Sequence, residues 1–291
     1  MIRVLVTGAA GLLGQHLVSG LQSKCDIIAV DKLPDPFENH HNLHYLQADL
    51  TDSHALKRIS ESINVDWLFN CAAYTDVDGC EKDRRLAETL NVELVRSLLG
   101  LRCRRFIHYS TDYVFDGKSG PYSEDDPVKP LGYYGQTKLL SEDVLRESGK
   151  PHLIIRSNVL FGTGINTRPN FITWLIDSLR DKQRVRIVTD QYNNPISALN
   201  LAEASIEAAD LGIDGILHLG GDDYISRYKI ALIVARYFKL DETLIEPITS
   251  AQLGQTASRP LRGGLKIDKA RSLLKTILMG FEEALSCLDK Y

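Results

Sequence analysis

Short apolar runs alternate with stretches of helical periodicity through the first half of the chain. The runs that predict strands lie at residues 2–6, 26–30, 43–47, 67–70, 105–109 and 152–156. The stretches that predict helices lie at residues 13–21, 54–63 and 84–99, and around Tyr134. Strands that alternate with helices pair in parallel and are covered on both faces, so the pattern predicts an α/β fold with a Rossmann-type, doubly wound parallel sheet.

The regular alternation weakens after about residue 157. Helices are expected at residues 171–179, 199–209, 226–238 and 268–274, extended segments at 185–188 and 216–219, and a turn at 193–195. We therefore expect residues 1–156 to form the Rossmann domain and residues 157–291 to form mainly a smaller mixed lobe, with segments near 185–210 returning to the first domain. Ligands of doubly wound sheets bind beyond the carboxyl ends of the strands, so a lobe at that edge would cover a bulky substrate.

Composition narrows the class of protein. The 291 residues are 44% hydrophobic and 25% charged, which is enough apolar material for a large core. The formal net charge is −4, so nucleic acid is not an expected partner, and the basic cluster at residues 102–105 is expected to be a solvated loop. Five cysteines without a Cys-x-x-Cys spacing indicate reduced thiols. With no leader before the first strand and no membrane-length apolar run, we expect a cytoplasmic protein without membrane contact.

A glycine-rich turn follows the first expected strand. Gly8, Gly11 and Gly14 would let the chain turn sharply into a helix whose N-terminal amides attract a pyrophosphate. The three-residue spacing differs from G-x-G-x-x-G and glycine turns are common, so the placement between a strand and a helix carries the inference. Asp31 ends the next strand about 20 residues later, where a carboxylate can bond the adenosine ribose. Together these features predict a dinucleotide site.

Residues after the neighbouring strands complete the expected cofactor site. Asp31 repels a 2′-phosphate and favours NADH over NADPH, although the adjacent Lys32 offsets part of that repulsion. Asp49 has two interpretations, a contact on the adenine side or a cap for the next helix. The residues expected to bind NAD(P)H are Gly8, Gly11, Leu12, Leu13, Gly14, Asp31, Lys32, Asp49, Leu50, Cys71, Ala72, Ala73, Tyr134 and Lys138.

A tyrosine and a lysine four residues apart supply candidate acid–base chemistry. On a helix, Tyr134 and Lys138 lie on one face, so the ammonium can stabilise the phenolate and lower the pKa of the phenol from about 10. Thr111, at the exit of the strand that ends near Tyr109, can hydrogen-bond a substrate oxygen, and Ser110 is the adjacent competitor for that role. Tyr-x-x-x-Lys is frequent by chance, so the glycine loop and the upstream hydroxyl pair are what make it significant.

These motifs resemble those of the extended short-chain dehydrogenase/reductase superfamily. The runs STDYVFDG (110–117) and YGQTK (134–138) look like its dTDP-4-dehydrorhamnose reductase family, and NCAAYTDVD (70–78), DQYNNP (190–195) and ASRP (257–260) add to the similarity. The match spans nearly the whole chain. It implies NAD(P)H-dependent reduction of the C4 ketone of a nucleotide-linked 6-deoxy-4-ketohexose, most directly dTDP-4-dehydro-L-rhamnose to dTDP-L-rhamnose.

The resemblance also assigns residues. It makes Thr111, Tyr134 and Lys138 the catalytic set. The residues expected to contact the substrate are Thr75, Val77, Asp78, Ser110, Thr111, Asn158 and Arg259. For Arg259 a structural ion pair is the alternative. Reductases of this family carry a tryptophan beside the sugar where this chain reads Val159, a departure that bears on the identity of the sugar.

A metal site is not expected. Some members of the family bind a metal through acidic residues at a dimer interface, and those acids have no match in this chain. His40, His41 and His44 precede a strand in a polar loop without other assembled ligands. A homodimer remains one candidate assembly.

Alternative functions stay open at this point. One is a reductase or epimerase for another sugar nucleotide, such as a GDP-linked or talose-type sugar. A dehydratase is disfavoured because Asp112 is followed by Tyr113 and not by glutamate. A second class is a non-catalytic nucleotide-binding subunit, since the regulatory beta subunit of methionine adenosyltransferase resembles the same family.

Overall fold

Seven parallel strands form the central sheet. The computed structural model describes residues 1–37 and 41–288. The strands of this sheet are β1 (Ile2–Thr7), β2 (Cys25–Asp31), β3 (Leu43–Gln47), β4 (Asn64–Asn70), β5 (Arg102–Thr111), β6 (His152–Ser157) and β11 (Gly215–His218). They are arranged in the order β11-β6-β5-β4-β1-β2-β3, and every neighbouring pair is parallel. This confirms the predicted doubly wound α/β fold.

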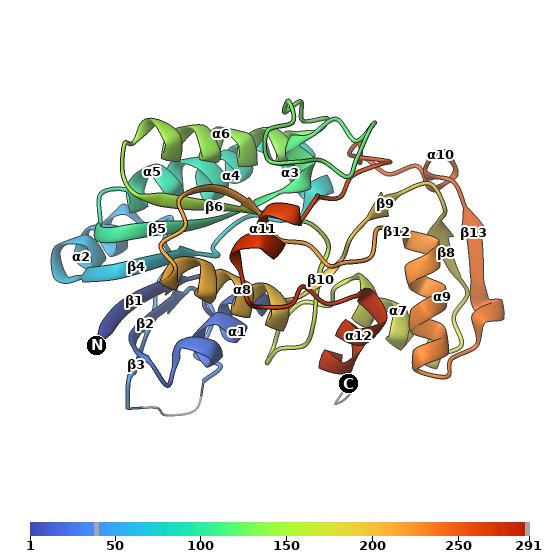
Figure 1. Cartoon of the computed structure of the whole chain (residues 1–291), viewed down its shortest axis with the longest axis horizontal. Coiled ribbons are helices and arrows are strands. Elements are labelled where there is room, and N and C mark those ends of the chain that lie inside the picture. The colour runs from blue at the N-terminus through green and yellow to red at the C-terminus, as the bar shows by residue number, and fades with distance from the viewer. Residues whose placement is uncertain (38–40, 289–291) are drawn as a thin grey trace.

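Helices cover both faces of the sheet (Figure 1). One face carries α1 (Leu12–Leu21), α8 (Ala198–Asp210) and α11 (Asp268–Leu273), whose apolar side chains form one core cluster with the strands. The other face carries α2 (Ser53–Ser62), α5 (Leu94–Leu98) and α6 (Tyr133–Glu147), which share a second cluster. Because both faces are buried, β1 is continuously apolar at its centre and has no alternating pattern.

The helix expected at residues 84–99 is divided into three pieces. It consists of α4 (Arg84–Glu88), a π-helical turn η1 (Thr89–Glu93) and α5, and a further short helix, α3 (Val77–Lys82), precedes it. The wider turn contains Asn91, whose amide accepts a hydrogen bond from the Tyr74 backbone N–H (2.8 Å) and donates to the Thr137 hydroxyl (3.0 Å). Asn91 thus ties the segment after β4 to helix α6.

The C-terminal lobe lies at one end of the sheet and has its own core (Figure 1). Its elements are β7 (Leu160–Phe161), α7 (Phe171–Arg180), β8 (Val185–Val188), β9 (Tyr192–Asn193), β10 (Ile196–Ser197), β12 (Ile225–Ser226), α9 (Arg227–Tyr237), η3 (Glu242–Leu244), β13 (Ile245–Ile248), α10 (Ser250–Leu253), α12 (Phe281–Ala284) and η4 (Leu285–Leu288). The expected turn at residues 193–195 joins two very short strands, β9 and β10.

The segment that returns to the first domain differs from the one expected. Strand β8 pairs with β13 inside the lobe, whereas α8 packs on α1 and β11 joins the main sheet beside β6. The returning parts are therefore α8, which lies in the second half of the predicted segment near 185–210, together with β11 and α11. The reason is that the apolar face of α8 belongs to the first core cluster.

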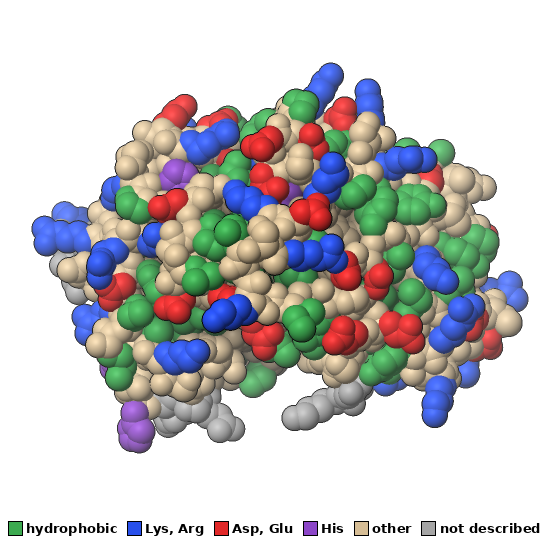
Figure 2. All heavy atoms as spheres, viewed as in Figure 1, with side chains coloured by type: hydrophobic (Ala, Val, Ile, Leu, Met, Phe, Trp, Pro, Cys, Tyr) green, Lys and Arg blue, Asp and Glu red, His purple; other side chains and the backbone are tan. Residues whose placement is uncertain are grey.

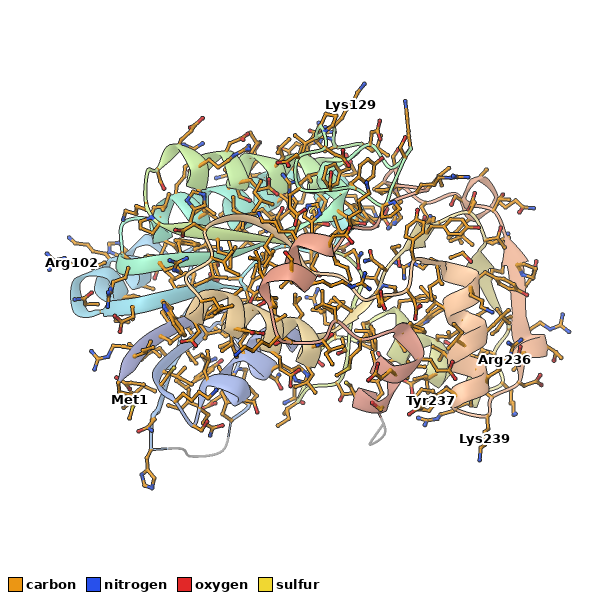
Figure 3. All side chains as sticks on the ribbon, in the orientation of Figure 1. Met1, Arg102, Lys129, Arg236, Tyr237 and Lys239 are labelled. Carbon is orange, nitrogen blue, oxygen red and sulfur yellow. The ribbon has the colours of Figure 1, made fainter. Side chains whose placement is uncertain are left out.

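Charges of both signs are interspersed over the face shown in Figure 2. The basic cluster at residues 102–105 is not a loop, because these residues begin β5. Arg104 and Arg105 pair with Asp66 and Asp214, and Arg102 projects from the end of the sheet (Figure 3). No helix in residues 1–37 or 41–288 combines the length and apolarity needed to span a bilayer.

Candidate active site

The glycine loop connects β1 to α1 in a space too small for side chains. Gly8 has φ +66°, and a Cβ there would lie 2.6 Å from the Ala72 backbone nitrogen. A Cβ on Gly14 would lie 2.3 Å from the Gly8 carbonyl oxygen. Helix α1 begins after Gly11 without a side-chain cap, which leaves its first amides available to an anion. The loop therefore has the form that a dinucleotide pyrophosphate requires.

Asp31 lies beside this loop, at the end of β2. Its carboxylate accepts hydrogen bonds from the backbone N–H groups of Ala10 and Leu33, both at 3.0 Å. A carboxylate has further lone pairs, so it can still accept from ribose hydroxyls. Lys32 is exposed next to it. The expected position of Asp31 is thus the observed one.

The other expected cofactor residues divide into two groups. Residues 71–73 follow β4, and the Cys71 N–H donates to the Thr7 carbonyl (3.1 Å), so this small-residue segment passes beside the glycine loop as expected. Asp49 accepts from the backbone N–H and hydroxyl of Thr51 (2.9 and 2.7 Å), and Asp52 is the residue that caps α2, so the cap interpretation of Asp49 is wrong. Leu50 is buried in the core between sheet and helices.

Thr111 and Tyr134 meet at the carboxyl end of the sheet. Thr111 is the last residue of β5, and Tyr134 lies in the first turn of α6. Burial raises the pKa of the Tyr134 phenol, and the neighbouring Tyr113 adds to the rise, while a hydrogen bond with the Thr111 hydroxyl opposes it. The rings of Tyr113 and Tyr134 are in edge contact, with centroids 5.7 Å apart. The two predicted groups are therefore in contact, but the expected lowering of the phenol pKa is wrong for this structure.

Lys138 is nearly fully buried one turn along α6. Its Nζ lies 3.3 Å from Nε2 of His108, which sequence reasoning did not single out. Burial lowers the pKa of Lys138 to about 8, and the charge of Glu142 opposes that change. The Lys138 side chain is therefore held beside His108.

Ser110 faces away from the substrate side. Its hydroxyl donates to Glu142 (2.5 Å), and Glu142 forms a two-pronged ion pair with Arg156, at 2.9 and 2.7 Å. All three side chains are buried between the strands and α6. This corrects the assignment of Ser110 to the substrate set, because alternate residues of a strand point to opposite faces of the sheet. Of Ser110 and Thr111, it is therefore Thr111 that remains the candidate to hydrogen-bond the substrate oxygen.

Two of the expected substrate residues pair with each other. Arg259 donates to both carboxylate oxygens of Asp78, at 3.1 and 2.8 Å, which is the ion-pair alternative, and the pair lies beside Tyr113. Thr75 is exposed just before α3, and Val77 begins that helix. Asn158 donates to the Asn194 side chain (2.5 Å), and Val159 follows it between β6 and β7.

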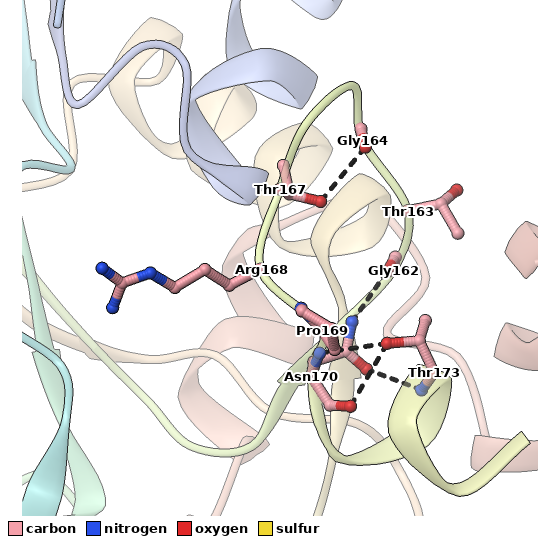
Figure 4. Close-up of a pocket in the computed structure, with 8 residues that line it drawn as sticks. All are labelled: Gly162, Thr163, Gly164, Thr167, Arg168, Pro169, Asn170 and Thr173. Atoms are coloured by element: carbon pink, nitrogen blue, oxygen red, sulfur yellow. Dashed lines mark hydrogen bonds between the residues drawn. The ribbon is translucent and has the colours of Figure 1, made fainter. Parts of the chain in front are cut away.

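A segment after β7 connects the lobe to the glycine loop. Gln15 on α1 exchanges two hydrogen bonds with the backbone of Ile165 (2.8 and 2.9 Å) and also donates to the Ala10 carbonyl (2.8 Å). A pocket of about 170 Å³ is lined by residues 162–164, 167–170 and 173, which are drawn in Figure 4. The lobe is thus anchored directly on the helix that would face the cofactor pyrophosphate.

The described residues contain no cluster of three or more potential metal ligands. His41 is exposed, and His44 lies 3.9 Å from Asp26 at the surface. His40 lies outside the described residues.

Acid sensitivity follows from a buried imidazole near the ion pair. Burial, together with the charge of Arg156, lowers the pKa of His218 to about 3. Between that value and the ordinary pKa of about 6.5, the unfolded chain binds more protons than the folded one, so stability falls as the pH drops below about 6.5. The raised pKa of Asp112, about 6, acts in the opposite direction.

As the pH drops below about 6.5, we expect the His218 imidazole to lower the free energy of unfolding by up to about 1.4 kcal/mol per pH unit. Urea denaturation at about pH 7 and about pH 5 measures the loss, and His218→Asn should lose part of it. An equally steep loss in the variant would assign the acid sensitivity to other groups.

Comparison with known proteins agrees with this geometry. The family described as the RmlD substrate binding domain matches residues 2–291. A Haloferax volcanii protein named "Probable low-salt glycan biosynthesis reductase Agl14" is 32% identical, over 98% of this chain and 96% of its own length. A dTDP-4-dehydrorhamnose reductase of Mycobacterium tuberculosis is 32% identical, over 88% of this chain and 82% of its own.

Two further matches bear on cofactor and function. The crystal structure of a dTDP-4-dehydrorhamnose reductase from Bacillus anthracis, in complex with NADP, superposes with a TM-score of 0.86 at 25% identity and covers 98% of this chain and 97% of its own. The methionine adenosyltransferase 2 subunit beta of Danio rerio is 28% identical over 93% of this chain and 84% of its own. With its sheet, glycine loop and family match taken together, this chain belongs to the RmlD substrate binding domain family.

Proposed function

We propose that the protein is an NAD(P)H-dependent reductase that converts the C4 ketone of a nucleotide-linked 4-keto-6-deoxyhexose to an alcohol, most directly dTDP-4-dehydro-L-rhamnose to dTDP-L-rhamnose. The observation that carries the proposal is the contact between Thr111 and Tyr134 at the same sheet edge as the glycine loop. The names of the reductases at 32% identity support the class of substrate.

Each residue has a defined part in the proposed reaction. When bound, NAD(P)H supplies the hydride that reduces the ketone carbon. Thr111 donates a hydrogen bond that holds the ketone oxygen beside the phenol, and Tyr134 gives that oxygen its proton as the alcohol forms. Lys138 places a positive charge one helical turn away, which favours the phenolate left behind. The Asp78–Arg259 pair beside Tyr113 offers polar groups to the sugar nucleotide.

The function is tested by supplying the purified protein with NADH or NADPH and a panel of dTDP- and GDP-linked 4-keto-6-deoxy sugars. We expect oxidation of the reduced cofactor, followed by its absorbance, with at least one dTDP-linked ketone. Absence of turnover with every sugar, together with tight cofactor binding, would contradict the proposal.

That contrary outcome defines the second candidate function, a nucleotide-binding regulatory subunit. Two observations favour it: the similarity to methionine adenosyltransferase 2 subunit beta, and Val159 in place of the tryptophan expected beside the sugar. The presence of Thr111, Tyr134 and Lys138 together favours the enzyme.

The cofactor preference is proposed to be for NADH. Asp31 accepts from the loop amide of Ala10, which aims its charge at the ribose side of the loop, where it would repel a 2′-phosphate. The Bacillus anthracis reductase was solved in complex with NADP, so the proposed preference of this chain is assigned to Asp31 and not to the fold.

Asp31→Asn keeps an acceptor for the Ala10 amide and removes the charge. We expect the ratio of kcat/KM for NADPH to that for NADH to rise roughly ten-fold, which corresponds to about 1.4 kcal/mol. Initial rates with both cofactors measure the ratio. An unchanged ratio would mean that Asp31 does not face the ribose.

We also propose a cytoplasmic location and a homodimer. Leu86 and Leu140 are 37% and 46% exposed on α4 and α6, the helices that cover one outer face. Sedimentation of the purified protein distinguishes a dimer from a monomer.

A further inference from the structure

A chain of buried hydrogen bonds runs beneath the proposed site and has no part in the reaction described above. The Thr7 hydroxyl donates to Asn70 Oδ1 (2.7 Å), and Asn70 Nδ2 lies 3.2 Å from His108 Nδ1. His108 Nε2 lies 2.9 Å from the Ser141 hydroxyl, which donates to the Lys138 carbonyl (2.6 Å). These residues come from the ends of β1, β4 and β5 and from α6, and each is at most 2% exposed.

The directions of these bonds determine the protonation of the imidazole. The Ser141 hydroxyl has one proton and directs it to a carbonyl, so its oxygen can only accept from His108, which requires a proton on Nε2. Nδ1 then has a lone pair that accepts the Asn70 N–H, and Asn70 Oδ1 accepts from Thr7. The donors of Thr7, Asn70, His108 and Ser141 in this series each face an acceptor, and a doubly protonated ring would set two donors against each other at Asn70.

The same ring borders the Lys138 side chain. Nζ lies 3.3 Å from Nε2, so the imidazole bounds the ammonium on one side. The other titratable groups that act on Lys138 are Glu142 on the same helix, Cys71 after β4 and Cys80 on α3.

This series of hydrogen bonds does not conduct protons to solvent. It ends at Thr7, which is fully buried and directs its hydroxyl proton inward to Asn70. The hydrogen bonds connect the last residue of β1, immediately before the glycine loop, with the helix that carries Tyr134 and Lys138. This geometry suits a rigid connection that fixes the position of helix α6 relative to the glycine loop.

We propose that His108 is a positioning residue, held as the neutral Nε2–H imidazole, which fixes helix α6 on the sheet and sets the place of Lys138 relative to Tyr134 and the glycine loop. This inference rests on the proposed reductase function for its kinetic consequences. Its structural content stands on the hydrogen bonds alone.

The kinetic test removes the acceptor of the Nε2 proton and leaves the imidazole in place. For Ser141→Ala we expect kcat to fall at least about ten-fold, KM for NADH to stay within about two-fold, and the alkaline limb of the pH–rate profile to move, because Lys138 is displaced and not lost. Ser141→Thr restores the hydroxyl and should restore the profile. A purely structural role predicts a lower melting temperature with kcat per folded enzyme and pH profile unchanged, and that result overturns the proposal.

A second test does not require activity. Nitrogen NMR of the protein with ¹⁵N-labelled histidine, assigned with His108→Gln, should show one ring with the Nε2–H neutral tautomer from about pH 5 to about pH 8. An imidazolium or an Nδ1–H ring in that range contradicts the inference. If no sugar nucleotide is reduced by the unmodified protein, the proposed function fails, whereas the tautomer and its change in Ser141→Ala still decide the role of His108.

Discussion

Tyr134→Phe is expected to reduce kcat by roughly 10² or more, while the affinity for NADH changes by no more than a few fold. The phenol lies against the Thr111 hydroxyl, and its ring, which phenylalanine keeps, packs edge-on against Tyr113. The substitution thus removes the proton and retains the packing. Steady-state rates and fluorescence titration with NADH measure the two quantities.

Tyr133→Phe is the matched control. Tyr133 precedes Tyr134 on α6, but its hydroxyl donates to Glu88 on the outer side of the helix. The control should keep its turnover, so a loss confined to Tyr134→Phe assigns the proton to that phenol. Unchanged turnover in Tyr134→Phe would remove Tyr134 from the mechanism.

The raised pKa of Tyr134 bears on the direction of the reaction. A phenol that stays protonated at neutral pH is ready to donate, as reduction of a ketone requires, whereas a depressed pKa would favour the reverse oxidation. The lowered pKa of Lys138, about 8, means that its charge is lost as the pH rises through that value. The phenolate formed after donation is then less stabilised, so the structure ties the alkaline side of the activity profile to Lys138.

The sheet could be predicted from the sequence because its strands are buried on both faces. The inner strands appear as short apolar runs, and the expected strand at residues 152–156 falls within β6. The lobe was less predictable because β7, β9, β10 and β12 have only two residues each, too few to establish a period. Their pairing depends on the packing of α7 and α9, which no local pattern reveals.

In the candidate site, too, local signals could be predicted from the sequence and long-range contacts could not. The glycine loop and Asp31 are local signals with a fixed spacing, and the structure brings them together. The partners of Ser110 and Asp78 are 32 and 181 residues away, so only the folded chain shows that one faces Glu142 and the other faces Arg259. His108 carried no signal beyond being a polar residue inside an apolar strand, which a search for buried polar positions could have detected.

Arg156→Met is expected to destabilise the protein by about 3–5 kcal/mol, because it leaves the Glu142 carboxylate buried without its partner. The two side chains are 2% and 0% exposed, and the Ser110 hydroxyl donates a further hydrogen bond to the carboxylate. Urea denaturation at neutral pH measures the loss.

The double variant Arg156→Met with Glu142→Leu separates the two possible reasons for that loss. If the cost comes from an uncompensated charge, removing the second charge should recover most of it, since burial of a complete ion pair is itself nearly neutral. If it comes from the packing of the guanidinium, which lies 5.2 Å from the centre of the Phe115 ring, the double variant should stay as unstable as the single one. Because Glu142 also supports the charge on Lys138, its replacement should lower the Lys138 pKa further and move the alkaline limb of activity to lower pH even where stability has been recovered.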